Sequence, residues 1–144
     1  MIDPCMYLFV NRGLWMSPGK IAAQAAHAAV EAYRISDQES NIFRLWYRGG
    51  HYKKIVLLGR DENHMRNIEA YLTARDIPLV TIIDEGHTEI APLSITAIGC
   101  AVLDKAHANN AAIFSTFELY KDEPPPKKDN RSPWQKFKDF LSES

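Results

Sequence analysis

Apolar positions follow two patterns along the chain, and together they predict an α/β fold. Short continuous apolar runs predict buried strands at residues 6–10, 53–58, 79–83 and 94–102. Segments with apolar residues three or four positions apart predict helices at residues 17–34, 36–48 and 61–76. The alternation of these elements predicts a three-layer α/β/α sandwich around a mixed, mostly parallel four-stranded sheet.

Polar residues at the boundaries of these segments give the expected helix starts. Ser17 followed by Pro18 is typical of a helix start, and Asp61 can cap the third helix. Ser36 and Glu39 have the spacing of a capping box, so the second helix is expected to begin there.

The chain after the third strand is expected to turn back on the sheet. The connection between residues 83 and 94 is short, so the next strand should run antiparallel to its neighbour. Further on, the alanine-rich residues 104–112 are expected to be helical. The alternating residues 114–120 are expected to add an edge strand.

Residues 122–144 are expected to form a tail outside the domain at residues 1–121. Three consecutive prolines make a stiff linker, and Ser132 with Gln135 can cap a short helix. The apolar face of that helix carries Trp134, Phe137 and Leu141. It is therefore expected to dock on this chain or on a homodimer partner. Disorder and the binding of another partner are the alternatives.

Composition narrows the class of protein. With 144 residues, 46% hydrophobic and 24% charged, the chain has the make-up of a single folded domain. A net charge of −1 gives no global indication of nucleic-acid binding, which would need a local patch. Cys5 and Cys100 match no metal-ligand spacing and are expected to be reduced core residues of a cytoplasmic protein. No apolar run approaches the roughly 20 residues of a membrane span, so no membrane partner is expected.

The 17–34 helix carries a polar seam. At about 100° per residue, its polar side chains within an arc of roughly 60° are Lys20, Gln24, His27 and Glu31. A solvent-facing stripe is the ordinary interpretation of this spacing. Because the seam joins Gln and His to alanines small enough to be covered, it also fits one wall of a site.

A second candidate stretch begins where the third strand ends. Asp84 can orient a lysine or a water, and Gly86 permits a tight turn. Thr88 and Thr96 supply hydroxyl groups beside it. Ligands of α/β sheets gather where strand ends meet helix starts, so Lys20 and Asp84 are expected to be neighbours. The alternative is an ordinary turn that leads into a strand.

These two stretches give the chain a family resemblance. The matching residues are Gly19-Lys20, Ala22-Ala23-Gln24, His27-Ala28, Asp84-x-Gly86-x-Thr88, Pro92, Thr96 and the FELY sequence that ends at Tyr120. In this order and spacing they resemble the archaeal and eukaryotic (type II) peptidyl-tRNA hydrolases. The resemblance implies an α/β fold around a mixed four-stranded sheet. It also implies hydrolysis of the ester between a peptide and the terminal ribose of tRNA, which recycles peptidyl-tRNA without a metal or cofactor.

The resemblance also implies roles for individual residues. The positions that match the family's site are Lys20, Gln24, His27, Asp84, Thr88 and Thr96. Asp84 is expected to orient or deprotonate the attacking water, with Lys20 paired to it and stabilising the oxyanion. Thr88, Thr96 and backbone amides near Gly86 are expected to complete the hydrogen-bond donors. Gln24 and His27 are expected to hold the substrate or to fix the geometry of the residues that contact it.

Basic residues outside these motifs are candidates for tRNA contact. They are Arg12, Lys53, Lys54 and Arg60, with Arg34, Arg44 and Arg48 as further candidates. Asn11 and Gly13 stand where the family usually has an Arg-x-Asp motif. This departure is expected to change how the substrate is held more than the reaction itself. Two alternatives to an enzyme therefore stay open. One is a catalytically silent tRNA- or RNA-binding module on the same fold, and the other is a protein-interaction domain that uses the Trp134 helix.

Overall fold

The sheet has the mixed architecture that the apolar runs predict. A computed structural model describes residues 1–85, 93–122 and 129–143. Its principal strands are β1 (Pro4–Asn11), β2 (Lys54–Gly59), β3 (Leu79–Ile83) and β4 (Ile95–Cys100), in the order β2-β1-β4-β3. β1 pairs with β2 in parallel, whereas β4 pairs antiparallel with both β1 and β3. β1, β2 and β3 therefore point the same way, and the expected reversal at β4 is confirmed.

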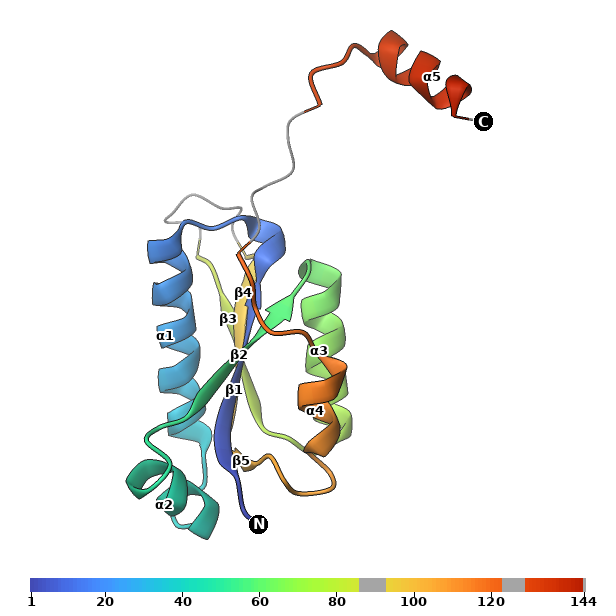
Figure 1. The fold of residues 1–144 in the computed structure, drawn as a ribbon. Helices are drawn as coiled ribbons and strands as arrows, with labels where there is room; N and C mark the ends of the chain where they lie inside the picture. The colour runs from blue at the N-terminus through green and yellow to red at the C-terminus, as the bar shows by residue number, and fades with distance from the viewer. Residues whose placement is uncertain (86–92, 123–128, 144) are drawn as a thin grey trace.

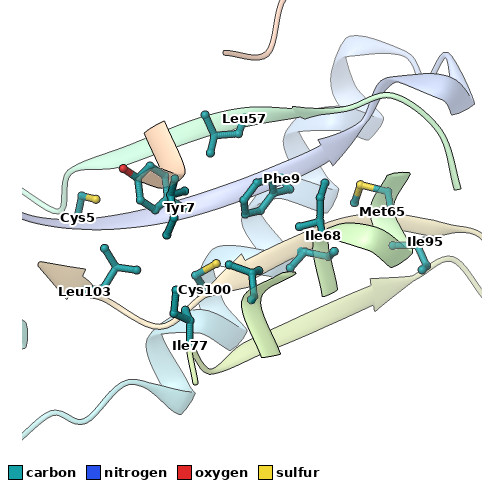
Figure 2. Close-up of a cluster of buried hydrophobic side chains, with 13 residues drawn as sticks. Cys5, Tyr7, Phe9, Leu57, Met65, Ile68, Ile77, Ile95, Cys100 and Leu103 are labelled. Atoms are coloured by element: carbon teal, nitrogen blue, oxygen red, sulfur yellow. The ribbon is translucent and has the colours of Figure 1, made fainter. Parts of the chain in front are cut away.

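The alternation of side chains along β1 builds the two cores of the sandwich. Cys5, Tyr7 and Phe9 belong to one buried cluster, packed against α3 (Glu62–Ala74) and α4 (Ala111–Thr116), as Figure 2 shows for part of it. The intervening Met6, Leu8 and Val10 belong to a second cluster under α1 (Pro18–Ile35) and α2 (Asn41–Arg48). Because successive strand residues point to opposite faces, β1 is covered by helices on both sides (Figure 1). The three-layer sandwich is confirmed.

Small residues place α1 directly on the sheet. Gly99 in β4 lies so close to the helix that an added Cβ would collide with the Ala28 carbonyl oxygen. The same Cβ would lie 3.0 Å from the Cβ of Ala32. Glycine and alanine thus fix the distance between α1 and β4, and with it the position of the polar seam on α1.

The second helix starts later than its sequence indicates. Ser36 ends α1 instead of opening α2: its hydroxyl donates to the Ala32 carbonyl at 2.7 Å and accepts from the Val102 N–H at 2.9 Å. Ser40 is the residue that caps α2, accepting from the Phe43 N–H at 3.1 Å. The predicted capping box at Ser36 is wrong because a tertiary hydrogen bond from β4's extension takes its hydroxyl.

The segment after β4 differs most from its sequence pattern. Residues 104–112 are not the expected helix: β5 (Leu103–Asp104) pairs with β1, and α4 begins only at Ala111. α4 also replaces the first part of the edge strand expected at residues 114–120. The end of that segment does pair with β2. The Leu58 N–H donates to the Glu118 backbone carbonyl at 2.8 Å, and the Tyr120 N–H donates to the Val56 backbone carbonyl at 3.0 Å.

The carboxyl-terminal helix α5 (Pro133–Ser142) begins where its cap predicts. The Ser132 hydroxyl accepts from the Gln135 N–H at 3.1 Å. None of the residues that the structure describes in α5 is buried, and its apolar side chains are exposed at Trp134, Phe137, Phe140 and Leu141. Within the described ranges, no helix is both long and apolar enough to cross a membrane.

Both cysteines are core residues, as expected from their isolation in the sequence. Cys5 and Cys100 are buried and free of any disulfide. Burial raises the pKa of the Cys5 thiol to about 11, and it raises the pKa of the Cys100 thiol as well. Both thiols are therefore protonated at neutral pH, which excludes them as nucleophiles.

Candidate functional site

Asp84 is held by its backbone at the end of β3. Its N–H donates to the Ser94 carbonyl at 2.9 Å, and its carbonyl accepts from the Leu93 N–H at 2.7 Å. These two bonds join the end of β3 to the residues just before β4. The residue is buried, with 4% of its surface exposed. Because the backbone of Asp84 is fixed by the sheet and its short side chain is buried, the carboxylate is held in one place.

The first turn of α1 brings Lys20 to this carboxylate. The Ser17 hydroxyl caps the helix by accepting from the Lys20 N–H at 3.3 Å. The Lys20 Nζ then lies 3.0 Å from Asp84 Oδ2, and the two side chains are only 11% and 3% exposed. The predicted meeting of Lys20 and Asp84 is confirmed. An ion pair this well covered places two opposite charges where water screens them weakly.

Gln24 and Thr96 form a second polar contact one helical turn further along α1. The Thr96 hydroxyl donates to Gln24 Oε1 at 2.5 Å and lies 3.3 Å from the Ile82 carbonyl. Both residues are buried, Thr96 completely. Thr96 therefore supports Gln24 from within the sheet instead of facing the open side of the site.

A small pocket opens above these contacts. It has a volume of about 260 Å³ and is lined by Lys20, Gln24, His27, Ile82, Ile83, Asp84 and Glu85. The sequence pattern had not pointed to Glu85 or the two isoleucines, although Glu85 directly follows Asp84 at the strand end. The pocket adjoins a second hollow of about 400 Å³ that shares His27, Ile82 and Ile83 and extends to Val30 and Glu31. The site is thus the end of a groove between α1 and β3.

Two of the predicted site residues, Gly86 and Thr88, lie outside the described residues. Five others meet at the pocket or beneath it: Lys20, Gln24, His27 and Asp84 line it, and Thr96 holds Gln24. Among the described residues, no group of three or more His, Cys, Asp or Glu side chains is placed to hold a metal ion.

Asn11 and Gly13, which replace the family's Arg-x-Asp motif, lie where β1 ends beside the end of β2. The Asn11 side chain is buried, donates to the Ile95 carbonyl at 2.9 Å and accepts from the Gly13 N–H at 2.9 Å. A Cβ on Gly13 would lie 2.6 Å from the Arg60 carbonyl oxygen. Asn11 and Gly13 therefore make a compact turn that braces β4, a structural role that spacing alone did not indicate.

The basic residues predicted to contact tRNA fall into two groups. Arg12 and Arg60 flank the paired residues Asn11 and Gly59, at the same end of the sheet as Asp84. Lys53 and Lys54 lie at the other end, where Lys54 pairs with Met6. The structure therefore does not bring Lys53 and Lys54 to the pocket.

Comparison of the sequence with known proteins shows the family of this chain. Residues 4–120 match the family model "Peptidyl-tRNA hydrolase PTH2". A peptidyl-tRNA hydrolase of Staphylothermus marinus is 36% identical over 93 residues, which cover 64% of this chain and 76% of the relative. One of Thermoplasma acidophilum is 37% identical over 95 residues, covering 65% and 80%. The human protein "Peptidyl-tRNA hydrolase 2, mitochondrial" is 36% identical over 95 residues, covering 65% and 52%. Since the family model spans most of the chain, from β1 to the strand-like end at Tyr120, this protein belongs to the PTH2 family of peptidyl-tRNA hydrolases.

Proposed function

We propose that the Lys20–Asp84 pair is the reaction centre at which this chain hydrolyses the ester of peptidyl-tRNA. Family membership supplies the reaction class, an ester hydrolase acting on peptidyl-tRNA and so recycling tRNA. The observation that carries the assignment of residues is the covered ion pair at the floor of the pocket, 3.0 Å from Nζ to Oδ2. Such a pair holds an acceptor and a donor of protons within one small volume.

The chemistry of ester hydrolysis matches these two groups. A water attacks the ester carbonyl carbon, an oxyanion forms on the carbonyl oxygen, and the bond to the ribose oxygen then breaks. In the proposal, Asp84 accepts the proton that the water loses. As its carboxylate is neutralised, the Lys20 charge is no longer balanced by Asp84 and stabilises the oxyanion. The proton finally passes to the departing ribose oxygen.

Gln24 and His27 have supporting places in this proposal. Because Thr96 occupies Gln24 Oε1, the amide Nε2 is the atom with which Gln24 can donate to the substrate. His27 lines the same pocket from the next turn of α1 and is exposed at the rim. Gly86 and Thr88 are proposed on sequence grounds alone as further donors to the oxyanion. Arg12 and Arg60 are proposed to contact phosphates beside the pocket.

The test is the release of deacylated tRNA from an N-blocked aminoacyl-tRNA. Lys20→Ala and Asp84→Asn are expected to abolish turnover while tRNA binding, measured separately, is retained. Lys105→Ala, which removes a lysine at the opposite end of the sheet, is the matched control and should turn over at the wild-type rate. Wild-type turnover by both site variants would refute the assignment.

A second function has one observation in its favour. Asn11 and Gly13 replace the two charged residues of the family's Arg-x-Asp motif with uncharged ones, which fits a catalytically silent RNA-binding module. The same assay separates the two: tRNA binding by the wild-type chain without any turnover would favour the module. A cytoplasmic location is part of the main proposal and is supported by the two free cysteines.

The exposed apolar face of α5 supports a docking role for the tail. A helix of 10 residues is marginal in water on its own, so its Trp134 and Phe137 side chains favour packing on this chain or on a second copy. Deleting residues 122–144 should then change either the mass in solution or the thermal stability of the domain. If both are unchanged, the tail does not dock.

A further inference from the structure

A cluster of aromatic side chains covers the end of the sheet opposite the pocket. Tyr33, at the end of α1, and Tyr47, in α2, are 38% and 45% exposed, and Tyr52, before β2, is 47% exposed. The ring centroids of Tyr47 and Tyr52 are 5.2 Å apart and those of Tyr33 and Tyr47 are 6.5 Å apart. These three rings, called here the tyrosine platform, rest on the buried Phe43 and Trp46.

The turn that presents Tyr52 is held in an unusual backbone conformation. His51 and Tyr52 have φ angles of 54° and 58°, in the left-handed region that non-glycine residues seldom occupy. The turn is fixed to Trp46 at two points: Trp46 Nε1 donates to the Lys53 carbonyl at 2.8 Å, and the Tyr52 N–H donates to the Trp46 carbonyl at 3.2 Å. Backbone strain that the surroundings maintain, at a place where an aromatic ring is displayed to solvent, is typical of a functional surface.

The segment that carries the platform is positively charged. Residues 31–54 include five Lys or Arg and three Asp or Glu, against a net charge of −1 for the whole chain. Lys54 Nζ lies 5.4 Å from the Trp46 ring centroid and 5.8 Å from that of Tyr52. Within the described ranges, neither Arg48 nor Lys54 takes part in an ion pair, whereas Arg34 and Arg44 are paired with glutamates. Lys54 Nζ donates to the Tyr52 carbonyl at 2.9 Å, which holds its charge beside the exposed Tyr52 ring, and Arg48 follows Tyr47 in α2. Neither charge is neutralised by a carboxylate of the described residues.

Exposed tyrosines beside cations that no carboxylate neutralises form a surface of the kind that RNA loops bind. Unstacked bases pack on tyrosine rings, and lysine and arginine neutralise phosphates. We propose that the tyrosine platform is a second RNA-contacting surface, which binds the body of tRNA away from the acylated end.

The geometry connects this surface to the pocket along α1. Lys20 and Tyr33 lie near opposite ends of the helix, about 20 Å apart along its axis. From residue 18 to residue 30 the helix contains no acidic residue, and its outward positions include the exposed Ala23 and Ala26. The acidic residue of α1 between this segment and Tyr33 is Glu31, and its carboxylate is paired with Arg34. An RNA chain with its acylated end at Lys20 would therefore meet no unpaired carboxylate of α1 on its way to the platform. The inference rests on the proposed function, which places the acylated end of the tRNA at Lys20. It gives Lys54, which lies far from the pocket, a place in substrate binding.

Two substrates separate the platform from the reaction centre. One is full-length N-blocked aminoacyl-tRNA, and the other is the same N-blocked aminoacyl group on a short CCA oligonucleotide, which cannot span both surfaces. In the variant Tyr47→Ala/Tyr52→Ala, kcat/KM for the full-length substrate is expected to fall about tenfold, the cost of losing stacking on exposed rings. The change should come from a higher KM at an unchanged kcat. The short substrate should be hydrolysed at the wild-type rate. Tyr47→Phe/Tyr52→Phe keeps the rings and should restore KM.

Charge and position are tested by two further double variants. Arg48→Gln/Lys54→Gln should weaken the binding of deacylated tRNA and lower the slope of log affinity against log salt by nearly two. Lys105→Ala/Phe114→Ala is the matched control, because Lys105 Nζ lies 4.2 Å from the centroid of the exposed Phe114 ring on α4. The control should bind tRNA like the wild type.

The outcomes are distinguishable. Wild-type KM in the tyrosine-to-alanine variant, or an equal loss on the short substrate or in the control, overturns the platform. If the wild-type chain hydrolyses neither substrate while the platform variants still lose tRNA affinity, the proposed function fails and the RNA-contacting surface stands.

Discussion

Lys20 Nζ lies 3.0 Å from Asp84 Oδ2 in a place where both side chains are almost fully covered. Removing one partner leaves the other charge buried and unpaired, which costs about 3–5 kcal/mol in proteins. We therefore expect Asp84→Asn and Lys20→Met each to lower the free energy of unfolding measured in urea. The double variant Lys20→Met/Asp84→Asn should be more stable than the sum of the two single losses implies. Additive losses would show that the pair is not coupled.

Thr96 should act on catalysis through Gln24. Thr96→Val keeps the shape but removes the hydroxyl that donates to Gln24 Oε1, leaving a buried acceptor unpaired at a cost of about 1–3 kcal/mol. Because Gln24 would lose its fixed orientation, we expect kcat/KM to fall about tenfold in steady-state assays, while Thr96→Ser restores it. Full activity in Thr96→Val would mean that the hydrogen bond has no part in positioning Gln24.

The sequence was sufficient for the elements whose local pattern and packing agree. The apolar runs of β1 to β4 and the caps at Ser17 and Asp61 were found where expected, because burial and capping there reinforce each other. Ser36 was misassigned, since its hydroxyl bonds to the Val102 N–H, a contact between residues far apart in the chain. Spacing cannot reveal such a partner.

The site shows the same division between local and long-range information. The helix seam and the strand-end rule were enough to bring Lys20 to Asp84. They did not show that Thr96 would be completely buried beneath Gln24, or that Lys54 would lie at the far end of the sheet. Both depend on strand register, which is set by pairing across the whole sheet.

Gly13 should resist restoration of the family's acidic residue. A Cβ at this position would lie 2.6 Å from the Arg60 carbonyl oxygen and 3.0 Å from the Asp61 Cα, both backbone atoms that cannot move without disturbing the start of α3. Gly13→Ala and Gly13→Asp are therefore expected to destabilise the fold by about 1–3 kcal/mol, measured as a lower melting temperature. Gly19→Ala is the control, because no atom beyond its chain neighbours and its own helix backbone lies within 4 Å of the added Cβ. A Gly13→Asp variant as stable as the wild type would show that the turn is not tightly packed.

His64 should make folding stability depend on pH. Its Nδ1 accepts from the Arg60 N–H at 3.0 Å, and burial, with a smaller effect of the Arg60 charge, holds the pKa of the imidazole below its ordinary value. The unfolded chain therefore binds the proton more readily than the folded one. Stability should be complete above a pH of about 6.5 and fall as the pH drops below it.

Urea unfolding at a series of pH values measures this dependence. His64→Gln should flatten the decline in stability between pH 7 and 5, since the titrating group is gone. His107→Gln is the matched control: His107 is exposed, and its Nδ1 likewise accepts a backbone N–H, from Asn109 at 3.1 Å. The control should keep the wild-type slope. If His64→Gln keeps that slope too, the pH dependence arises from carboxylates elsewhere in the fold and not from this imidazole.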